Sequence, residues 1–219
     1  MGQCDRLEQL GPYCYQGNGA CFPLGRDSLE LGAFATVRPR WRVCDLGCGG
    51  GVLLLLLAGR AEGLTLAGVE REAAAAETAR ANLARNALPG TILTGDLRTE
   101  LLPAGAWDLA VSNPPYFQRG TGASGGGARM EEHLTLPELC AAAGRLLRHG
   151  GRFALVHRPE RLADLMACLR GAALEPKRLR LIQHDGTHAP SAVLLEAAKH
   201  GRPGLEILPV RLLHPAQPE

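Results

Sequence analysis

A short run in the middle of the chain, Asn113, Pro114, Pro115 and Tyr116, carries the groups best suited to chemistry. An amine attached to a base or an amide is a poor nucleophile, because its lone pair is delocalised into the π system. The Asn113 side-chain oxygen and the Pro114 carbonyl could accept hydrogen bonds from the two N–H groups of such an amine and so free its lone pair. The prolines restrict the backbone, which fixes the direction of that carbonyl in advance. Tyr116 could stack on a flat target. The run predicts catalysis of transfer to an exocyclic amine; a plain Asn-Pro turn is the alternative.

A glycine-rich loop is the second candidate site. A short apolar run ends at Asp45, and Gly47, Gly49 and Gly51 follow at alternate positions before the apolar residues 52–58. Glycine lets the backbone approach a ligand closely, and the helix start offers free N–H groups. The spacing lacks the Gly-x-Gly-x-x-Gly of dinucleotide-binding proteins and the Gly-Lys-Ser/Thr of a P-loop. It resembles the first motif of class I S-adenosylmethionine methyltransferases, with a purely structural turn as the alternative.

Further polar residues stand where predicted strands end, and ligands of an open parallel sheet bind at that edge. Glu70 could accept both hydroxyls of a ribose, and Asp96 could accept from the exocyclic amine of an adenine. A charge at a helix start and a turn aspartate are the respective alternatives. Asp45 is expected to orient the methionine end of the cofactor. The expected S-adenosylmethionine contacts are Asp27, Asp45, Gly47, Cys48, Gly49, Gly51, Glu70, Arg71, Asp96, Leu97, which packs beside the adenine ring, and Asn113.

Predicted strands alternate with predicted helices after the glycine loop. We expect strands at 64–70, 91–94, 107–112, 152–157, 177–184 and 191–199, and helices at 51–61, 71–86, 136–147 and 159–174. This alternation predicts an α/β fold with a doubly wound, mostly parallel sheet covered on both faces. We expect an N-terminal arm at 1–21, with a short hairpin as a candidate, and a single domain at 22–219 whose tail from 204 adds a final edge segment.

Two helices carry more detailed expectations. The helix before the glycine loop should be capped by Asp27 or Ser28. In the alanine-rich helix at 71–86, Leu83 and Ala87 should share one face. The expected apolar face of the first helix is Leu29, Leu31, Ala33 and Phe34.

Composition limits the class of protein. Hydrophobic residues make up 46% of the chain, enough for a core, and the net charge of +2 predicts no overall field for nucleic acid. The stretch 145–180 holds nine Lys and Arg against three acidic residues, which is either a footprint for a polyanion or a set of solvated faces. Seven cysteines without a Cys-x-x-Cys pair predict a reduced, cytoplasmic protein with no metal. No signal sequence or membrane span is expected.

With these motifs in place, the chain resembles the bacterial tRNA adenine-N6 methyltransferases that modify the adenine beside the anticodon of a valine tRNA. The resemblance covers roughly 22–199. Residues 25–34 resemble that family's Gly-x-Asp-x-x-x-Leu-Gly-Ala-aromatic segment, and Asn-Pro-Pro-Tyr is shared by methyltransferases of exocyclic amines. Met130 stands where relatives often have His. The resemblance implies a seven-stranded sheet with an antiparallel last pair, S-adenosylmethionine as cofactor and tRNA as partner, which the charges of 175–180 suit.

Three alternatives remain open at the level of sequence. A guanine-N2 methyltransferase of ribosomal RNA would share the Asn-Pro-Pro-Tyr motif. So would a protein glutamine methyltransferase, although those enzymes usually carry an N-terminal helical domain that the short arm before Phe22 does not match. A non-catalytic module that binds RNA or S-adenosylmethionine is the third, and the intact motif from Asn113 to Tyr116 argues against it.

Overall fold

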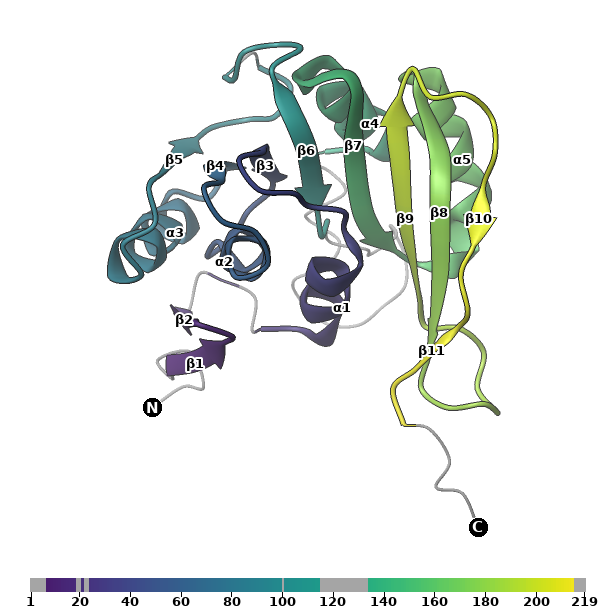
Figure 1. Cartoon of the computed structure of the whole chain (residues 1–219), viewed down its shortest axis with the longest axis horizontal. Coiled ribbons are helices and arrows are strands. Elements are labelled where there is room, and N and C mark those ends of the chain that lie inside the picture. Colours follow the sequence, from purple (N-terminus) through teal and green to yellow (C-terminus); the bar gives the residue numbers. More distant parts are fainter. Residues whose placement is uncertain (1–6, 19–20, 22–23, 100, 115–133, 215–219) are drawn as a thin grey trace.

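The strands form one twisted sheet whose order explains where a ligand can bind. The structure is a computed structural model that describes residues 7–18, 21, 24–99, 101–114 and 134–214. The strand order across the sheet is β5-β4-β3-β6-β7-β9-β8, with β10 and β11 beside β8 (Figure 1). Their bounds are β3 (Arg42–Leu46), β4 (Thr65–Glu70), β5 (Gly90–Thr94), β6 (Trp107–Ser112), β7 (Leu147–His157), β8 (Leu174–Gln183), β9 (Ala192–Lys199), β10 (Glu206–Ile207) and β11 (Arg211–Leu212).

Pairing within the sheet confirms the predicted fold class. The strands from β5 to β7 are all parallel, and β9 runs antiparallel to both of its neighbours, β7 and β8. The described sheet has nine strands rather than seven, because the short β10 and β11 of the tail pair in parallel with β8. Because β3, β4, β6 and β7 are parallel, their carboxyl ends meet at one edge of the sheet. The carboxyl end of β8 lies at the same edge, since β7 and β8 are both antiparallel to β9.

Helices cover both faces of the sheet. On one face lie α1 (Arg26–Phe34), α2 (Val52–Ala58) and α3 (Ala73–Arg85), and on the other α4 (Leu136–Leu146) and α5 (Leu162–Gly171) (Figure 1). Val43 packs into the hydrophobic cluster of the first face and Cys44 into that of the second, and both are fully buried. Successive side chains of a strand point to opposite faces, so a strand covered on both sides is apolar throughout.

Several element boundaries differ from the prediction. β7 begins at Leu147, immediately after α4, where a strand was expected only from Arg152; Leu147 is already extended and pairs with Trp107. Pro159–Arg161 forms a 3-10 turn before α5, which ends at Gly171 because Leu174 already belongs to β8. Ala87 lies beyond the end of α3 at φ 51° and is exposed, so it does not share a face with Leu83.

The cap of the first helix lies two or three residues before the predicted one. Its N-cap is Gly25, and neither Asp27 nor Ser28 caps it. Leu29 is 39% exposed, and the buried residues are instead Leu31, Gly32 and Phe34. The reason lies in helix packing: α1 approaches α2 so closely that a Cβ on Gly32 would stand 2.8 Å from the Leu56 Cδ1. Asp27 and Ser28 are consequently available to the carboxyl edge of the sheet.

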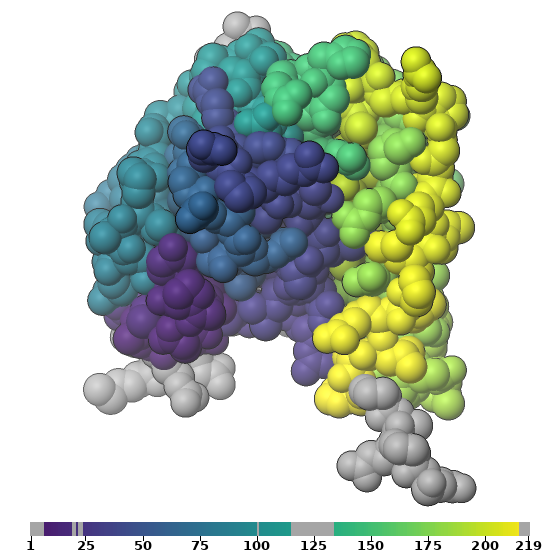
Figure 2. Space-filling model, in the orientation of Figure 1, coloured from purple at the N-terminus to yellow at the C-terminus, as the bar shows by residue number. Residues whose placement is uncertain are grey.

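The predicted hairpin of the arm is present as β1 (Leu7–Leu10) and β2 (Tyr13–Gln16). It lies against α3 (Figure 2), whose Asn82 and Asn86 side chains accept hydrogen bonds from the backbone N–H groups of Gln16 (3.0 Å) and Cys14 (2.9 Å). Tyr15 is buried beside Gly50, where a Cβ would stand 2.6 Å from its hydroxyl oxygen. The arm thus supports the back of the glycine loop. The division into an arm at 1–21 and a domain at 22–219 stays a prediction.

Candidate active site

The glycine loop joins β3 to α2 in a conformation that needs glycine. Gly47, Gly49 and Gly51 have φ of 79°, 49° and 85°, in the left-handed region that residues with a Cβ avoid. A Cβ on Gly47 or Gly49 would meet no described atom within 4 Å, whereas one on Gly51 would stand 3.4 Å from the Ala79 Cβ. The first two glycines therefore border open space at the carboxyl edge, and the third lets α2 pack against α3.

Four backbone N–H groups of the loop already have acceptors within the protein, whereas the sequence led us to expect free donors. Those of Gly47 and Cys48 both donate to the Val69 carbonyl, at 2.9 and 3.1 Å, and that of Gly51 donates to the Cys48 carbonyl. The Gly49 N–H donates to the Glu70 carboxylate at 2.8 Å. These bonds hold the shape of the loop, so what these four residues offer a ligand is the space over Gly47 and Gly49.

Glu70 ends β4 and links the loop to the helix that follows. One carboxylate oxygen holds the Gly49 N–H, and the other accepts from the Glu72 N–H at 2.8 Å. Each carboxylate oxygen has a second lone pair, and the side chain is only partly buried. Glu70 can therefore still accept hydroxyl groups at the edge of the sheet. Arg71 beside it is exposed; the pKa of Asp96 is lowered mainly by hydrogen bonds from Arg98, and the positive charge of Arg71 adds slightly to this shift.

Asp45 is the most unusual carboxylate of the site. It is 1% exposed, and its Oδ1 accepts no hydrogen bond from any of the described residues. Burial, and then the negative charge of Glu70, raise the pKa of Asp45 well above its usual range. A buried acceptor without a donor is costly, and such groups are normally satisfied by a partner. An ammonium or hydroxyl group of a ligand next to the glycine loop would supply that donor.

Asp96 and Leu97 follow β5 at the same edge. Arg98 binds the Asp96 carboxylate with its backbone N–H at 2.9 Å and its Nε at 3.0 Å, and these bonds lower the pKa of Asp96 to about 2. An amine bound to Asp96 would have to share the carboxylate with Arg98. Leu97 borders a small recess lined by Val69, Thr99, Leu101, Leu102, Arg145 and Leu146. The recess is too small to hold a ring, so the expected packing of Leu97 beside the adenine stays a prediction.

Asn113 stands at the end of β6, level with the glycine loop. Asp45 pairs with Val111 in the sheet, and the Ser112 hydroxyl donates to the Leu46 carbonyl at 2.7 Å, so the two strand ends are tied together. The Asn113 Nδ2 donates to the Ser28 Oγ at 2.8 Å. Pro114 is partly buried beside it. The other two residues of the motif, Pro115 and Tyr116, lie outside the described residues. So do the glycine-rich stretch 120–127 and Arg129, which follow the motif in the chain.

Ser28 is the contact that sequence reasoning missed, because it was assigned only to helix capping. Its neighbour Asp27 is half-buried, and burial raises the pKa of Asp27 although the nearby Arg158 opposes the shift. A polar pair in the first turn of a helix whose other face is apolar is the signal that could have indicated a role at the site. The structure therefore brings together Asp27, Asp45, the glycines, Glu70 and Asn113 at one edge, with Asp96 and Leu97 at the end of β5.

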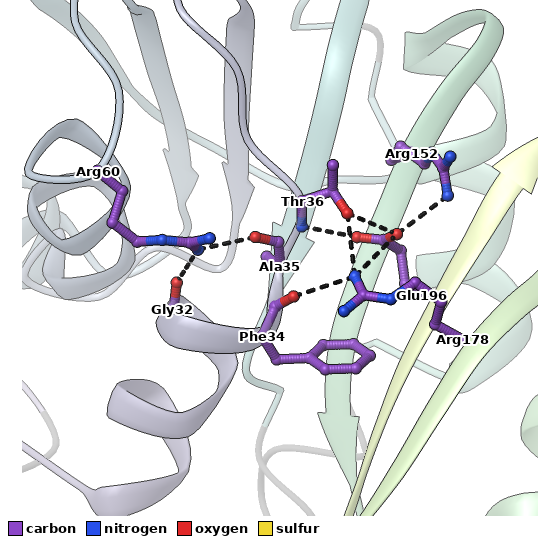
Figure 3. Close-up of polar contacts among 8 residues, drawn as sticks. All are labelled: Gly32, Phe34, Ala35, Thr36, Arg60, Arg152, Arg178 and Glu196. Carbon is purple, nitrogen blue, oxygen red and sulfur yellow. Dashed lines mark hydrogen bonds and ion pairs between the residues drawn. The ribbon is translucent and has the colours of Figure 1, made fainter. Parts of the chain in front are cut away.

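Several arginines of the basic stretch 145–180 are paired with acidic residues. Arg148 pairs with Asp108, Arg170 with Glu175, and Arg152 and Arg178 with Glu196 (Figure 3). Arg178 belongs to the segment whose charges the resemblance had assigned to a tRNA backbone, but its guanidinium is half-buried against Phe34. These charges stabilise the fold. In the described part of the chain, no helix is long and apolar enough to cross a membrane. The same residues hold no group of three His, Cys, Asp or Glu arranged for a metal ion.

Sheet order, glycine loop and the polar strand ends define the class I methyltransferase fold. The chain belongs to the methyltransferase small domain family, whose model matches residues 31–169. It is 33% identical to a Porphyromonas gingivalis protein named tRNA1(Val) (adenine(37)-N6)-methyltransferase, over 81% of this chain and 75% of that one. A Dickeya chrysanthemi protein of the same name is 36% identical, over 81% and 73%. Among solved structures, a predicted O-methyltransferase from Agrobacterium tumefaciens superposes with a TM-score of 0.72, over 87% of this chain and 88% of that one, and its 23% identity supports the fold alone.

Proposed function

We propose that this protein transfers the methyl group of S-adenosylmethionine to the N6 amine of an adenine in tRNA, beside the anticodon. The observation that carries the proposal is the position of Asn113. It ends the strand next to β3 and stands level with the glycine loop and the buried Asp45, so an acceptor for an amine and a cradle for a cofactor share one edge.

The residues present fit S-adenosylmethionine. The donor that Asp45 needs matches the ammonium of the cofactor's methionine end, and Glu70 at the end of β4 suits the ribose hydroxyls. The space over Gly47 and Gly49 admits close approach. Leu97 is the apolar neighbour for the adenine, and Asp96 the acceptor for its amine, in competition with Arg98. When bound, the cofactor supplies an electrophilic methyl on a sulfonium.

Asn113 and Pro114 act on the other reactant. Their oxygens accept hydrogen bonds from the two N–H groups of the target amine. These bonds draw the nitrogen toward tetrahedral geometry and expose its lone pair. The cofactor would supply its methyl group to this lone pair, and Asn113 and Pro114 would keep holding the nitrogen while its extra proton passes to water. This pathway needs no strong base, because the amine proton becomes acidic once the methyl group has arrived.

The choice of substrate rests on the relatives, whose names specify an adenine of tRNA. Asn-Pro-Pro-Tyr alone would also suit guanine in ribosomal RNA or a protein glutamine. Because tRNA is modified in the cytoplasm of bacteria, we place the protein there.

The test supplies labelled S-adenosylmethionine with separate pools of tRNA, ribosomal RNA and protein. We expect label in tRNA, recovered as N6-methyladenosine after digestion to nucleosides and mass spectrometry. Asn113→Ala should abolish transfer while weakening cofactor binding less than Asp45→Ala, which should lose both. Label in guanine or in a protein amide, or no transfer to any pool, would contradict the proposal.

A further inference from the structure

Three histidine side chains from distant parts of the sequence meet on the surface. His184 and His188 lie in the connection between β8 and β9, and His214 follows β11. The His184 ring centroid is 4.6 Å from that of His214 and 5.5 Å from that of His188. Arg26, the first residue of α1, extends the row, with its Nη1 3.3 Å from the His214 Nε2. All four residues are exposed, and we call them the histidine–arginine surface.

This surface lies at the same edge of the sheet as the candidate active site. β8 is parallel to β7, because both are antiparallel to β9, so the connection after Gln183 lies at the carboxyl edge. The backbone N–H of His214 donates to the His184 carbonyl at 2.8 Å, and this bond holds the tail at the carboxyl edge. Arg26 precedes Ser28, the partner of Asn113, by two residues. Figure 1 shows the start of α1, β11 and the β8–β9 connection at one end of the molecule.

The charged groups around the surface nearly balance, since Arg26, Arg158 and Arg211 are accompanied by the carboxylates of Asp27, Glu30 and Asp185. Asp185 contacts His188, whose Nδ1 lies 2.7 Å from the Asp185 Oδ1, and the same oxygen accepts from the Thr187 N–H at 2.8 Å. The hydrogen bonds from His188 and Thr187 hold the pKa of Asp185 well below its usual range. Glu30 is paired with Arg211 at 3.2 Å, and Arg158 is exposed nearby, in electrostatic contact with Asp27. The described residues do not form a metal site here.

We propose that the histidine–arginine surface binds the unpaired nucleotides that flank the methylated adenine. Bases of single-stranded RNA stack on histidine rings and on the guanidinium plane of arginine, and phosphates pair with arginine. A row of such planar groups at the same edge of the sheet as Asn113 has the chemistry that this partner requires. The inference rests on the proposed function and adds to it the surface that positions the RNA.

The test compares two double variants of the full chain in binding to an unmodified valine tRNA transcript. His184→Ala/His214→Ala removes two neighbouring rings of the surface, whose centroids are 4.6 Å apart. The matched control is His149→Ala/His200→Asn, because those two rings are also exposed and close together, with centroids 5.6 Å apart, but lie at the opposite, amino edge. Asparagine is chosen at His200 since its φ is 54°, which asparagine tolerates.

We expect the Kd for tRNA and the KM in methyl transfer to rise about tenfold or more in His184→Ala/His214→Ala, in line with the loss of base stacking. The control should stay within about twofold, and both variants should bind S-adenosylmethionine and melt like the wild type. Arg26→Gln should reduce the slope of log Kd against log salt by about 0.7, the value for one phosphate of a single strand.

Two outcomes would overturn the inference and are distinguishable. If the wild type methylates tRNA and both double variants bind it equally well, the surface does not hold RNA, and the proposed function stands. If the wild type transfers no methyl group to tRNA, the proposed function fails and the surface proposal fails with it.

Discussion

The carboxylate of Glu196, fully buried in the middle of β9, accepts two hydrogen bonds from Thr36, one from its backbone N–H at 2.7 Å and one from its hydroxyl at 3.0 Å (Figure 3). Arg152 and Arg178 pair with the same carboxylate at 3.0 and 3.5 Å. On the other side, Arg60 donates to the carbonyls of Gly32 and Ala35. The end of α1 is thereby anchored to the sheet, and its first turn carries the contact with Asn113.

Glu196→Gln should lower the free energy of unfolding by about 3 kcal/mol, because it leaves two partly buried guanidinium groups without their carboxylate. Urea denaturation measures the change. The control is Glu175→Gln, which loses the pair with Arg170, an arginine whose side chain is 63% exposed; it should cost less than about 1 kcal/mol. Equal losses in the two variants would show that the Glu196 cluster does not anchor α1.

Gly49→Ala should weaken the binding of S-adenosylmethionine much more than it weakens the fold. Its φ of 49° costs alanine about 1–2 kcal/mol, and the new methyl group enters the space expected for the cofactor. Gly105→Ala is the control, since Gly105 has a similar φ of 63°, no described atom near its Cβ position, and a place at the amino edge. Calorimetric titration should show a Kd raised at least tenfold at position 49 and unchanged at 105. A similar Kd for both variants would place the cofactor elsewhere.

Asp45→Asn should reduce the affinity for S-adenosylmethionine at least tenfold, since a hydrogen bond to a charged group contributes about 1.5–3 kcal/mol. Without cofactor, the pKa of Asp45 is raised in the folded state by burial, so the unfolded carboxyl ionises first. The stability of the wild type relative to the variant should therefore fall as pH rises above about 4. Comparison with Asp185→Asn should give the opposite pH dependence: the folded-state pKa of Asp185 is lowered, so the stability of the wild type relative to that variant should rise with pH. Melting curves between pH 3 and 8 test both, and parallel profiles would refute the assignment.

Ser28→Ala should lower kcat about tenfold while the affinity for S-adenosylmethionine is unchanged, because one hydrogen bond orients the Asn113 carboxamide. Ser28→Thr keeps a hydroxyl and should recover part of the rate. Ser191→Ala serves as control, since the Ser191 hydroxyl donates to the Ile182 carbonyl at 3.4 Å and not to Asn113. Measurements at saturating tRNA separate kcat from KM. A normal kcat in Ser28→Ala would mean that Asn113 is oriented by its other surroundings.

His157 should make the fold sensitive to acid. It ends β7 with only 4% exposure, and burial, followed by the charge of Arg161, lowers the pKa of His157 to about 4. The unfolded imidazole titrates near 6.5, so the unfolded chain binds the proton first and stability falls as pH drops from about 6.5 to 4. His157→Gln removes this titration but can still accept from the Arg158 N–H, which lies 2.9 Å from the His157 Nδ1. A pH profile of unfolding that is equally steep in the variant would rule out His157 as its source.

The sequence alone determined the alternation of strands and helices and the polar residues at the strand ends. Buried parallel strands such as β6 are apolar runs with defined ends, and the turn after β3 requires glycine wherever φ is positive. These are local properties of the chain, so periodicity and residue type predict them. The antiparallel end of the sheet came from the resemblance, because pairing between β7, β8 and β9 depends on segments far apart in the sequence.

Only the tertiary structure decided which side chains meet. Ser28 and Asn113 are 85 residues apart, and Arg26 and His214 are 188 apart, separations at which no local pattern operates. The loop N–H groups looked available because a sequence does not show that Val69 and Glu70 accept them. The sequence left the basic stretch open between a footprint and solvated faces, because it does not show that Asp108 and Glu196 pair with Arg148 and Arg152. The physical reason is the same in each case: a local propensity requires only neighbours in the chain, whereas a partner is set by how the sheet and its covering helices pack.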